Sequence, residues 1–451
     1  MAFLWYRVAL TATLAGISIS TALAANAASR PNVIVIMADD LGAEGLHCYG
    51  STIYTTPHLD RMAQEGVRFN NAYATPLCTP TRVMIMSGLY PNRTGHLALI
   101  GKKPGSRMSA EIRTFGHDFR QAGYKTAIAG KWQLGKFDEF PDQPVEHGFD
   151  EYCLWTWFYG DQKYSRYYRP GIYTNGRLTI GKEADYGPDT YANFLLDFID
   201  RNQSEPFLIY FPMALVHSPF VHPPRLEELA RSRFTDDLDK NTQAFGHMIT
   251  YMDDIIGQLR AKLEEHEIAK NTLVLFTADN GTHKAITSKL PGMEVTGGKG
   301  SMMESGVRVP LIVWWPDTIQ PAVLDELFCL ADVLPTICSA AGIKLKRDVD
   351  GINLSHLLYG EDGPVRDHVF MAYKGEQYFV REHRLRLSQA GKKEVKQELF
   401  DISVSSNEER YSEKVVEDQS MPAELQRLQK IMEVYQAIPQ EYHSNSDQNE
   451  S

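Results

Sequence analysis

The chain has little cysteine and no long apolar run beyond its first residues. Only five of its 451 residues are cysteine, at positions 48, 78, 153, 329 and 338. Cysteines this sparse do not predict a dense disulfide framework, and an odd number leaves one thiol without a partner. No segment after the first 27 residues is long and apolar enough to predict a membrane span. Whether the other four cysteines pair stays open at this point.

An excess of positive charge is also missing. The chain carries 46 Lys and Arg residues against 57 Asp and Glu residues, a formal net charge of −11. We therefore expect no nucleic-acid partner and no general attraction to an anionic membrane. An anionic substrate would have to be held by a local cluster of Lys and Arg. The hydrophobic content of 43% predicts a large core, shared between two lobes more readily than one.

The first residues predict an export signal. Arg7 precedes a short apolar stretch, and Ala22 and Ala24 form an A-x-A pattern. We interpret residues 1–24 as a signal peptide, which places the chain in the periplasm or outside the cell with no membrane attachment after cleavage. The alternative is an uncleaved N-terminal anchor, because Trp5 and Tyr6 are unusual ahead of the Arg.

Apolar strands alternate with amphipathic helices over most of the chain. Strands are predicted at 33–37, in the stretch EPFLIYFPMALVHSPF with its end at His217, in NTLVLFTADNG and in VRVPLIVWWPD, with a long helix over 241–267. This alternation predicts an α/β fold with a large, mostly parallel sheet between helices. Beyond residue 345 the strands are shorter and alternate with polar residues, which is typical of a small antiparallel sheet. We therefore divide the chain into a catalytic domain (30–345), a C-terminal α+β subdomain (346–440) and a polar tail (441–451).

Polar side chains follow two of the predicted strands directly. Asp39 and Asp40 come after the first strand, and Asp279 and Asn280 after NTLVLFTA. Ligands of open α/β sheets bind at the carboxyl ends of strands, and these oxygen donors suit Ca²⁺ or Mg²⁺ better than zinc. For either pair alone, turn formation and helix capping are the competing interpretation.

Cys78 stands at the predicted start of a helix, since Pro80 is tolerated in a first turn and TRVMIM follows. A helix N-terminus stabilises negative charge on a nucleophile or a bound oxyanion. A buried, inert thiol is the alternative. The local sequence offers no His base for an ordinary thiol nucleophile.

Six motifs in order give a resemblance to a known family. They are ADDLG (38–42), CTPTR (78–82), GKWQLG (130–135), HGFDEY (147–152), ADNG (278–281) and GGKGSMMESGVRVP (297–310). Together they resemble the formylglycine-dependent sulfatases, which include the arylsulfatases and belong to the alkaline phosphatase superfamily. The resemblance implies an alkaline phosphatase-like fold and a sulfuric ester hydrolase.

It also implies a role for the cysteine. In that family a formylglycine-generating enzyme oxidises the motif cysteine, here Cys78, to an aldehyde (3-oxoalanine). One hydroxyl of the hydrated aldehyde attacks the sulfur of a sulfate ester, and the other collapses to release sulfate.

Further roles follow by resemblance, position by position. Asp39, Asp40, Asp279 and Asn280, with the modified Cys78, would hold Ca²⁺, with Mg²⁺ as the less favoured ion.

Arg82 and Lys131 match the residues that hold the aldehyde hydrate, and Lys299 matches one that contacts the sulfate. His217 matches the histidine near the leaving group and is our candidate general acid, since an imidazole titrates near neutral pH.

One residue departs from the family pattern. Gln133 stands where the family usually has His in GKWHLG, and an amide can hydrogen-bond but cannot transfer a proton. We expect Gln133 to contact substrate. From its placement just after Asn280, His283 is a further candidate for the substrate pocket.

The segment 152–182 is rich in aromatic residues interleaved with Lys and Arg. Aromatic rings stack on sugars and basic residues bind sulfates, which favours a sulfated carbohydrate as substrate, although these aromatics would equally pack against the core. Two other functions remain open: a phosphodiesterase or phosphonate monoester hydrolase on the same fold, and a non-catalytic protein that binds sulfated glycans.

Overall fold

The computed structural model describes residues 30–100, 104–225, 238–402, 411–416 and 420–442. The predicted signal peptide (1–24) and nearly all of the predicted polar tail lie outside these ranges, so both stay predictions. Within these ranges, every helix is too short or too polar to cross a membrane.

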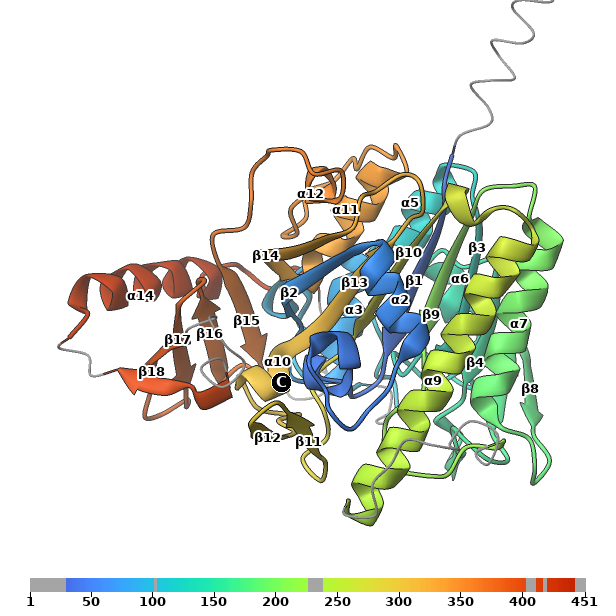
Figure 1. Cartoon of the computed structure of the whole chain (residues 1–451), viewed down its shortest axis with the longest axis horizontal. Coiled ribbons are helices and arrows are strands. Elements are labelled where there is room, and N and C mark those ends of the chain that lie inside the picture. The colour runs from blue at the N-terminus through green and yellow to red at the C-terminus, as the bar shows by residue number, and fades with distance from the viewer. Residues whose placement is uncertain (1–29, 101–103, 226–237, 403–410, 417–419, 443–451) are drawn as a thin grey trace, which may run out of the picture.

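A ten-stranded sheet forms the centre of the molecule, with its parallel strands in the middle (Figure 1). β1 pairs in parallel with β10 and β9, and β3 pairs in parallel with β9 and β4. β1 is buried along its whole length, as expected for a strand covered on both faces. In spatial order the strands are β14 (Ala322–Cys329), β2 (Val67–Tyr73), β13 (Arg308–Trp314), β10 (Thr272–Ala278), β1 (Asn32–Ala38), β9 (Phe207–Pro212), β3 (Lys125–Lys131), β4 (Glu151–Trp155), β7 (Gly171–Thr174) and β8 (Arg177–Ile180).

Helices cover both faces of this sheet. In Figure 1, α2 (Pro57–Glu65), α7 (Gly187–Asn202) and α9 (Lys240–Glu265) lie in front, and α3 (Cys78–Ser87), α5 (Phe115–Gln121) and α11 (Val333–Ala340) lie behind. α9 begins where the Asp239 carboxylate accepts hydrogen bonds from the backbone N–H groups of Asn241 and Thr242. Shorter elements fill the connections: α4 (Pro91–Thr94), α6 (Gln143–Glu146), α10 (Glu304–Val307), α12 (Ser355–Leu358), the 3₁₀ helices η1 (Ala43–Gly45), η2 (His47–Tyr49), η3 (Ala269–Asn271) and η4 (Leu330–Asp332), and the hairpins β5 (Phe158–Tyr159)–β6 (Gln162–Lys163) and β11 (Thr287–Leu290)–β12 (Met293–Thr296).

A second, smaller sheet follows near the C-terminus and is entirely antiparallel. Its strands are β15 (Val369–Tyr373), β16 (Gln377–Arg381), β17 (Leu385–Ala390), β18 (Lys396–Asp401) and β19 (Lys414–Val416), and α14 (Pro422–Gln436) packs on β16 and β17. The predicted fold class is therefore confirmed: a large, mostly parallel sheet between helices and a small antiparallel sheet. The domain boundary at residue 345 stays a prediction.

A buried ion pair joins the small sheet to α10, which a hydrogen bond connects to the large sheet. Arg381 on β16 lies 3.0 Å from Glu304 on α10, and both side chains are fully buried. Glu304 also accepts a hydrogen bond from the Tyr73 hydroxyl at the end of β2. Removing one partner of such a pair leaves a buried charge without compensation, which lowers the free energy of unfolding by about 3–5 kcal/mol. These contacts hold α10, and with it the loop that carries Lys299.

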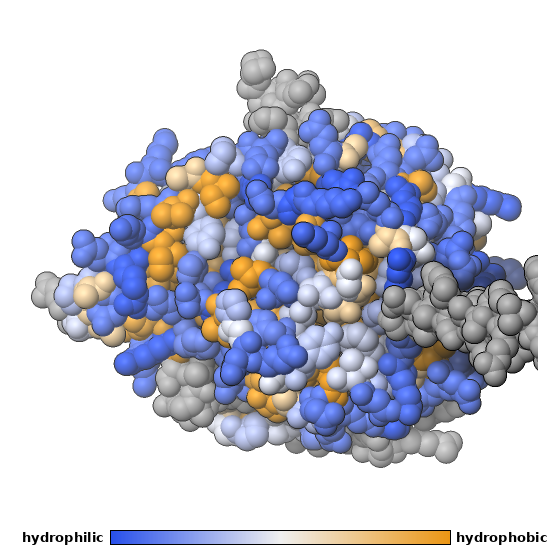
Figure 2. All heavy atoms as spheres, turned by 90° about the horizontal axis from the view of Figure 1, so that it is seen from above, coloured by the Kyte–Doolittle hydropathy of each residue, from blue (hydrophilic) through white to orange (hydrophobic). Residues whose placement is uncertain are grey.

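Polar residues dominate the outer surface and apolar residues the interior. The face in Figure 2 is mostly hydrophilic, with apolar groups scattered in small patches. All five cysteines are free thiols; Cys48 is half-buried and the other four are buried. None of them pairs in a disulfide, which settles the question that the sequence left open.

Candidate active site

The two acidic pairs predicted from the sequence lie next to each other. β1 and β10 are neighbours in register, with Ala38 opposite Ala278, so Asp39–Asp40 and Asp279–Asn280 leave the sheet at the same edge. The backbone N–H of Asp40 donates to Asp279 Oδ1 at 3.1 Å. Asp40 has a φ of 64°, a left-handed conformation that non-glycine residues rarely adopt outside functional sites.

Asp39 is the centre of a buried cluster of ion pairs. Lys131 Nζ at the end of β3 lies 2.8 Å from both carboxylate oxygens of Asp39. Arg166 NH1 lies 3.0 Å from Asp39 Oδ2. Arg82 on α3 donates to Asp279 Oδ2 at 2.7 Å and to the backbone carbonyl of Lys131 at 2.9 Å. The cluster thereby fixes β1, β3, β10 and α3 relative to one another.

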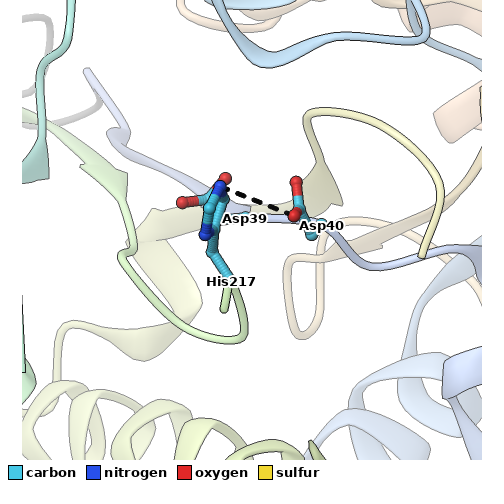
Figure 3. A group of neighbouring side chains, drawn as sticks. All are labelled: Asp39, Asp40 and His217. Carbon is cyan, nitrogen blue, oxygen red and sulfur yellow. Dashed lines mark ion pairs between the residues drawn. The ribbon is translucent and has the colours of Figure 1, made fainter. Parts of the chain in front are cut away.

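Asp40 forms the outer part of the same site. Lys299 Nζ lies 2.5 Å from its Oδ1, and Asn280 Nδ2 donates to that oxygen at 2.9 Å. His217 faces Asp40 from the loop after β9, with Nε2 3.7 Å from Oδ2 (Figure 3). Oxygen and nitrogen atoms of Asp39, Asp40 and His217 lie within 4.8 Å of one another, close enough to share a metal ion.

The pKa values of the buried carboxylates are shifted in different directions. Burial would raise the pKa of Asp39, but Lys131 and the neighbouring cations hold it well below its usual value. Burial and the charge of Asp39 raise the pKa of Asp279 to about 6, although Arg82 opposes this. A bound cation would relieve the repulsion between these two carboxylates.

Burial also changes the pKa of His217. It lowers the pKa of His217 to about 3, against the opposing charges of Asp40 and Asp39, so the ring is uncharged at neutral pH. Nδ1 lies 2.5 Å from the Ser218 carbonyl and donates to it, which leaves Nε2 facing the site. This direction is opposite to the near-neutral pKa on which the prediction of a general acid rested, and the role of His217 stays a prediction.

Cys78 is the first residue of α3 and is buried. Its Sγ lies 3.3 Å from Gln133 Oε1, the side chain at the position where the family pattern has histidine. Gln133 has a φ of 53°, a second left-handed non-glycine residue in the site.

Gly130, just before Lys131, has a φ of 118°, and a Cβ there would lie 2.1 Å from the Pro212 carbonyl oxygen. Only glycine allows β3 to approach β9 this closely.

These groups open onto a cavity of about 680 Å³. Its wall includes five of the side chains discussed above, namely Cys78, Gln133, Arg166, His217 and Lys299. His283 does not line it; its ring packs edge-on against Phe220, and its Nδ1 accepts a hydrogen bond from the Ala285 N–H. Asp39 and Asp40 contact this wall through Arg166, His217 and Lys299.

Comparison with known proteins identifies the family. The sulfatase family model matches residues 31–343, and a model of the C-terminal part of N-sulphoglucosamine sulphohydrolase matches residues 298–437. The chain belongs to the sulfatase family. Human arylsulfatase A is 32% identical over 382 residues, covering 78% of this chain and 73% of its own. Human N-acetylgalactosamine-6-sulfatase is 30% identical over 386 residues, covering 78% and 70%.

A bacterial relative is similar over much the same length. The N-acetylgalactosamine-6-O-sulfatase of Bacteroides thetaiotaomicron is 28% identical, covering 75% of this sulfatase and 78% of its own chain. These relatives confirm the predicted enzyme class, a sulfatase that hydrolyses sulfate esters.

Solved structures confirm the fold. Ps i-CgsB in complex with k-i-k-neocarrahexaose superposes with a TM-score of 0.79 at 23% identity, covering 93% of this sulfatase and 96% of that chain. BT4656 in complex with D-glucosamine-2-N,6-O-disulfate gives a TM-score of 0.73 at 20% identity, covering 94% and 99%.

The position of Arg166 was not predicted from the sequence. Arg166 was one of the basic residues of the segment 152–182 that we expected to bind sulfates of the substrate. In the structure Arg166 is buried, pairs with Asp39, and lies over the Trp155 ring at 4.2 Å. No sequence signal distinguishes it from its exposed neighbour Arg169.

We predict that Arg166→Met lowers kcat/KM for a small aryl sulfate about 10- to 100-fold, the usual cost of removing a partner that orients a metal ligand, the role predicted for Asp39. Arg169→Met is the matched control, because Arg169 is exposed and its one carboxylate partner among the described residues is Glu183, at 3.4 Å. Steady-state kinetics on 4-nitrophenyl sulfate with both variants make the comparison. Equal activity of Arg166→Met and the wild type would contradict this role.

Proposed function

We propose that this sulfatase removes sulfate from a sulfated carbohydrate, using formylglycine at position 78 and a Ca²⁺ ion. The observation that carries the proposal is that Cys78, Arg166 and Lys299 line one cavity, and that Arg166 and Lys299 pair with the buried carboxylates of Asp39 and Asp40. The carbohydrate substrate is supported by the relatives, whose names refer to N-acetylgalactosamine 6-sulfate, glucosamine disulfate and a neocarrahexaose.

The charges around the cavity suit a sulfate ester. Three carboxylates, Asp39, Asp40 and Asp279, face the four cations Arg82, Lys131, Arg166 and Lys299. The cluster therefore has one positive charge in excess before any ion binds. A sulfate monoester carries one negative charge, which this excess attracts.

The residues present fit Ca²⁺. Asn280 Oδ1 is buried and has no hydrogen-bond partner among the described residues, so it is free to bind a cation. The nearby carboxylates of Asp39, Asp40 and Asp279 complete a set of hard oxygen donors. A Ca²⁺ ion held there would withdraw charge from the sulfate oxygens. His217 lies beside this set, and we assign its neutral Nε2 to the substrate rather than to the ion.

The formylglycine hydrate would supply the two hydroxyls needed to attack sulfur and then release sulfate. The chain's own residues position these groups: Gln133 Oε1 contacts the side chain at position 78, and Lys299 extends to the same part of the cavity. Arg82 and Lys131 pair with Asp279 and Asp39 and keep these carboxylates in place. His217 lines the cavity, and we assign it to the leaving oxygen.

This function requires two further conditions, which we propose with it. A formylglycine-generating enzyme must modify Cys78, and the chain must be exported, as the predicted signal peptide indicates.

Replacement of the nucleophile tests the proposal. We expect Cys78→Ala to lower hydrolysis of N-acetylgalactosamine 6-sulfate by a factor on the order of 10³ or more, as removal of a nucleophile does elsewhere. Cys48→Ala is the control, a half-buried free thiol on η2. Sulfate release is measured for both, with melting curves to show that each folds. Full activity of Cys78→Ala would exclude the mechanism. If the unmutated protein hydrolysed a phosphonate monoester but no sulfate ester, the phosphorus alternative would be favoured.

Removal of the ion tests the metal assignment. We expect chelation to abolish hydrolysis and Ca²⁺ to restore it better than Mg²⁺. Asn280→Ala should weaken Ca²⁺ binding about 10- to 100-fold, measured by calorimetric titration of the metal-free protein. Asn353→Ala is the control, since Asn353 is remote from the cluster and bonds Ser339. Unchanged Ca²⁺ affinity in Asn280→Ala would contradict the assignment.

A further inference from the structure

We propose that Trp157 and Lys163 form a subsite for a sugar that carries a second anionic group, a sulfate ester or a carboxylate, besides the sulfate that is cleaved. The inference rests on the proposed function, because it places the cleaved sulfate at Cys78 and Lys299. Both residues line the same cavity as Cys78.

A short hairpin holds the two side chains together. β5 and β6 pair Phe158 with Lys163, and the Tyr164 N–H donates to the Trp157 carbonyl at 3.1 Å. Trp155 Nε1 donates to the Tyr164 carbonyl at 3.2 Å. At the tip of the hairpin, the Gly160 N–H donates to Asp138 at 2.7 Å. These bonds at the base and the tip order a rim element that would otherwise be mobile.

The pairing of charges singles out Lys163. Three Lys and Arg side chains line the cavity, and two of them already have carboxylate partners: Arg166 pairs with Asp39 and Lys299 with Asp40. Lys163 is exposed and has no carboxylate within ion-pair distance among the described residues. A substrate bound at Cys78 therefore meets one uncompensated positive charge at the rim, which favours an anionic group there.

The aromatic residues of the segment 152–182 also differ in burial and in access to the cavity. Of those in the segment 152–182, Tyr152, Trp155, Tyr167 and Tyr173 are buried and pack in the core. Trp157 is only half-buried, lines the cavity, and is supported by Trp155 at 6.1 Å and Phe158 at 5.1 Å between ring centroids. A partly exposed aromatic ring in a cavity wall, supported by its neighbours, is suited to stack on a sugar. Trp157 would therefore bind the ring and Lys163 its second charge.

Binding to the Cys78→Ala protein, which leaves the sugar intact, tests the subsite by calorimetry. The ligands are N-acetylgalactosamine 6-sulfate, N-acetylgalactosamine 4,6-disulfate, and N-acetylgalactosamine 6-sulfate linked to glucuronic acid. We expect at least one dianionic ligand to bind about 10-fold more tightly than the monosulfate, the effect of one charge-assisted contact. The ligand that does so tells whether a sulfate or a carboxylate is recognised.

Variants then assign the preference to its residues. Lys163→Ala should abolish the preference and leave monosulfate binding unchanged, whereas Trp157→Ala should weaken all three ligands. Lys182→Ala is the matched control, an exposed lysine of the same segment that does not line the cavity. Equal binding of all three ligands, no binding of any, or a preference that survives Lys163→Ala would each overturn the subsite.

Hydrolysis by the unmodified sequence, produced with a formylglycine-generating enzyme, is measured separately. Absence of hydrolysis with an intact Lys163-dependent preference would contradict the proposed function and leave the subsite standing. Hydrolysis without that preference would support the proposed function and contradict the subsite.

Discussion

The structure of the site depends on one buried carboxylate, that of Asp39. It has no exposed surface, and it is held by Lys131, Arg166 and, at 3.7 Å, Arg82. A buried charge is tolerated only when its partners compensate the loss of hydration, and removing one partner costs about 3–5 kcal/mol. Because these partners come from β3, α3 and the segment after β6, the cluster ties separate parts of the chain to the end of β1.

The same cluster gives the site its chemistry. Burial and the nearby charge of Asp39 raise the pKa of Asp279, although Arg82 lies beside both carboxylates. A divalent cation beside these carboxylates would stabilise their charged forms. Among the described residues, the buried Asn280 Oδ1 has no hydrogen-bond partner of its own. Lys299 and His217 line the cavity, and under the proposed function they contact the anionic substrate. In that proposal, the charges that balance one another in the protein also suit a metal ion and a sulfate.

The sequence predicted the parts of this site that follow from local pattern. Asp39 and Asp279 come directly after apolar strands, and adjacent parallel strands bring their ends together, so their proximity could be inferred from residue order alone. Cys78 was recognised by its motif, and its place at the start of α3 by Pro80. The partners of Asp39 could not be inferred, because Arg166 lies in an irregular segment whose path only the tertiary structure determines. The low pKa of His217 was missed for a similar reason, since burial has no local sequence signal.

The central claim is that Cys78 is the precursor of the nucleophile and not an inert buried thiol. The most direct measurement is the mass of the proteolytic peptide that contains Cys78, from protein produced together with a formylglycine-generating enzyme. We expect the mass of an aldehyde at position 78, with Cys48, Cys153, Cys329 and Cys338 unchanged as internal controls. A thiol that persists at position 78 under those conditions would contradict it.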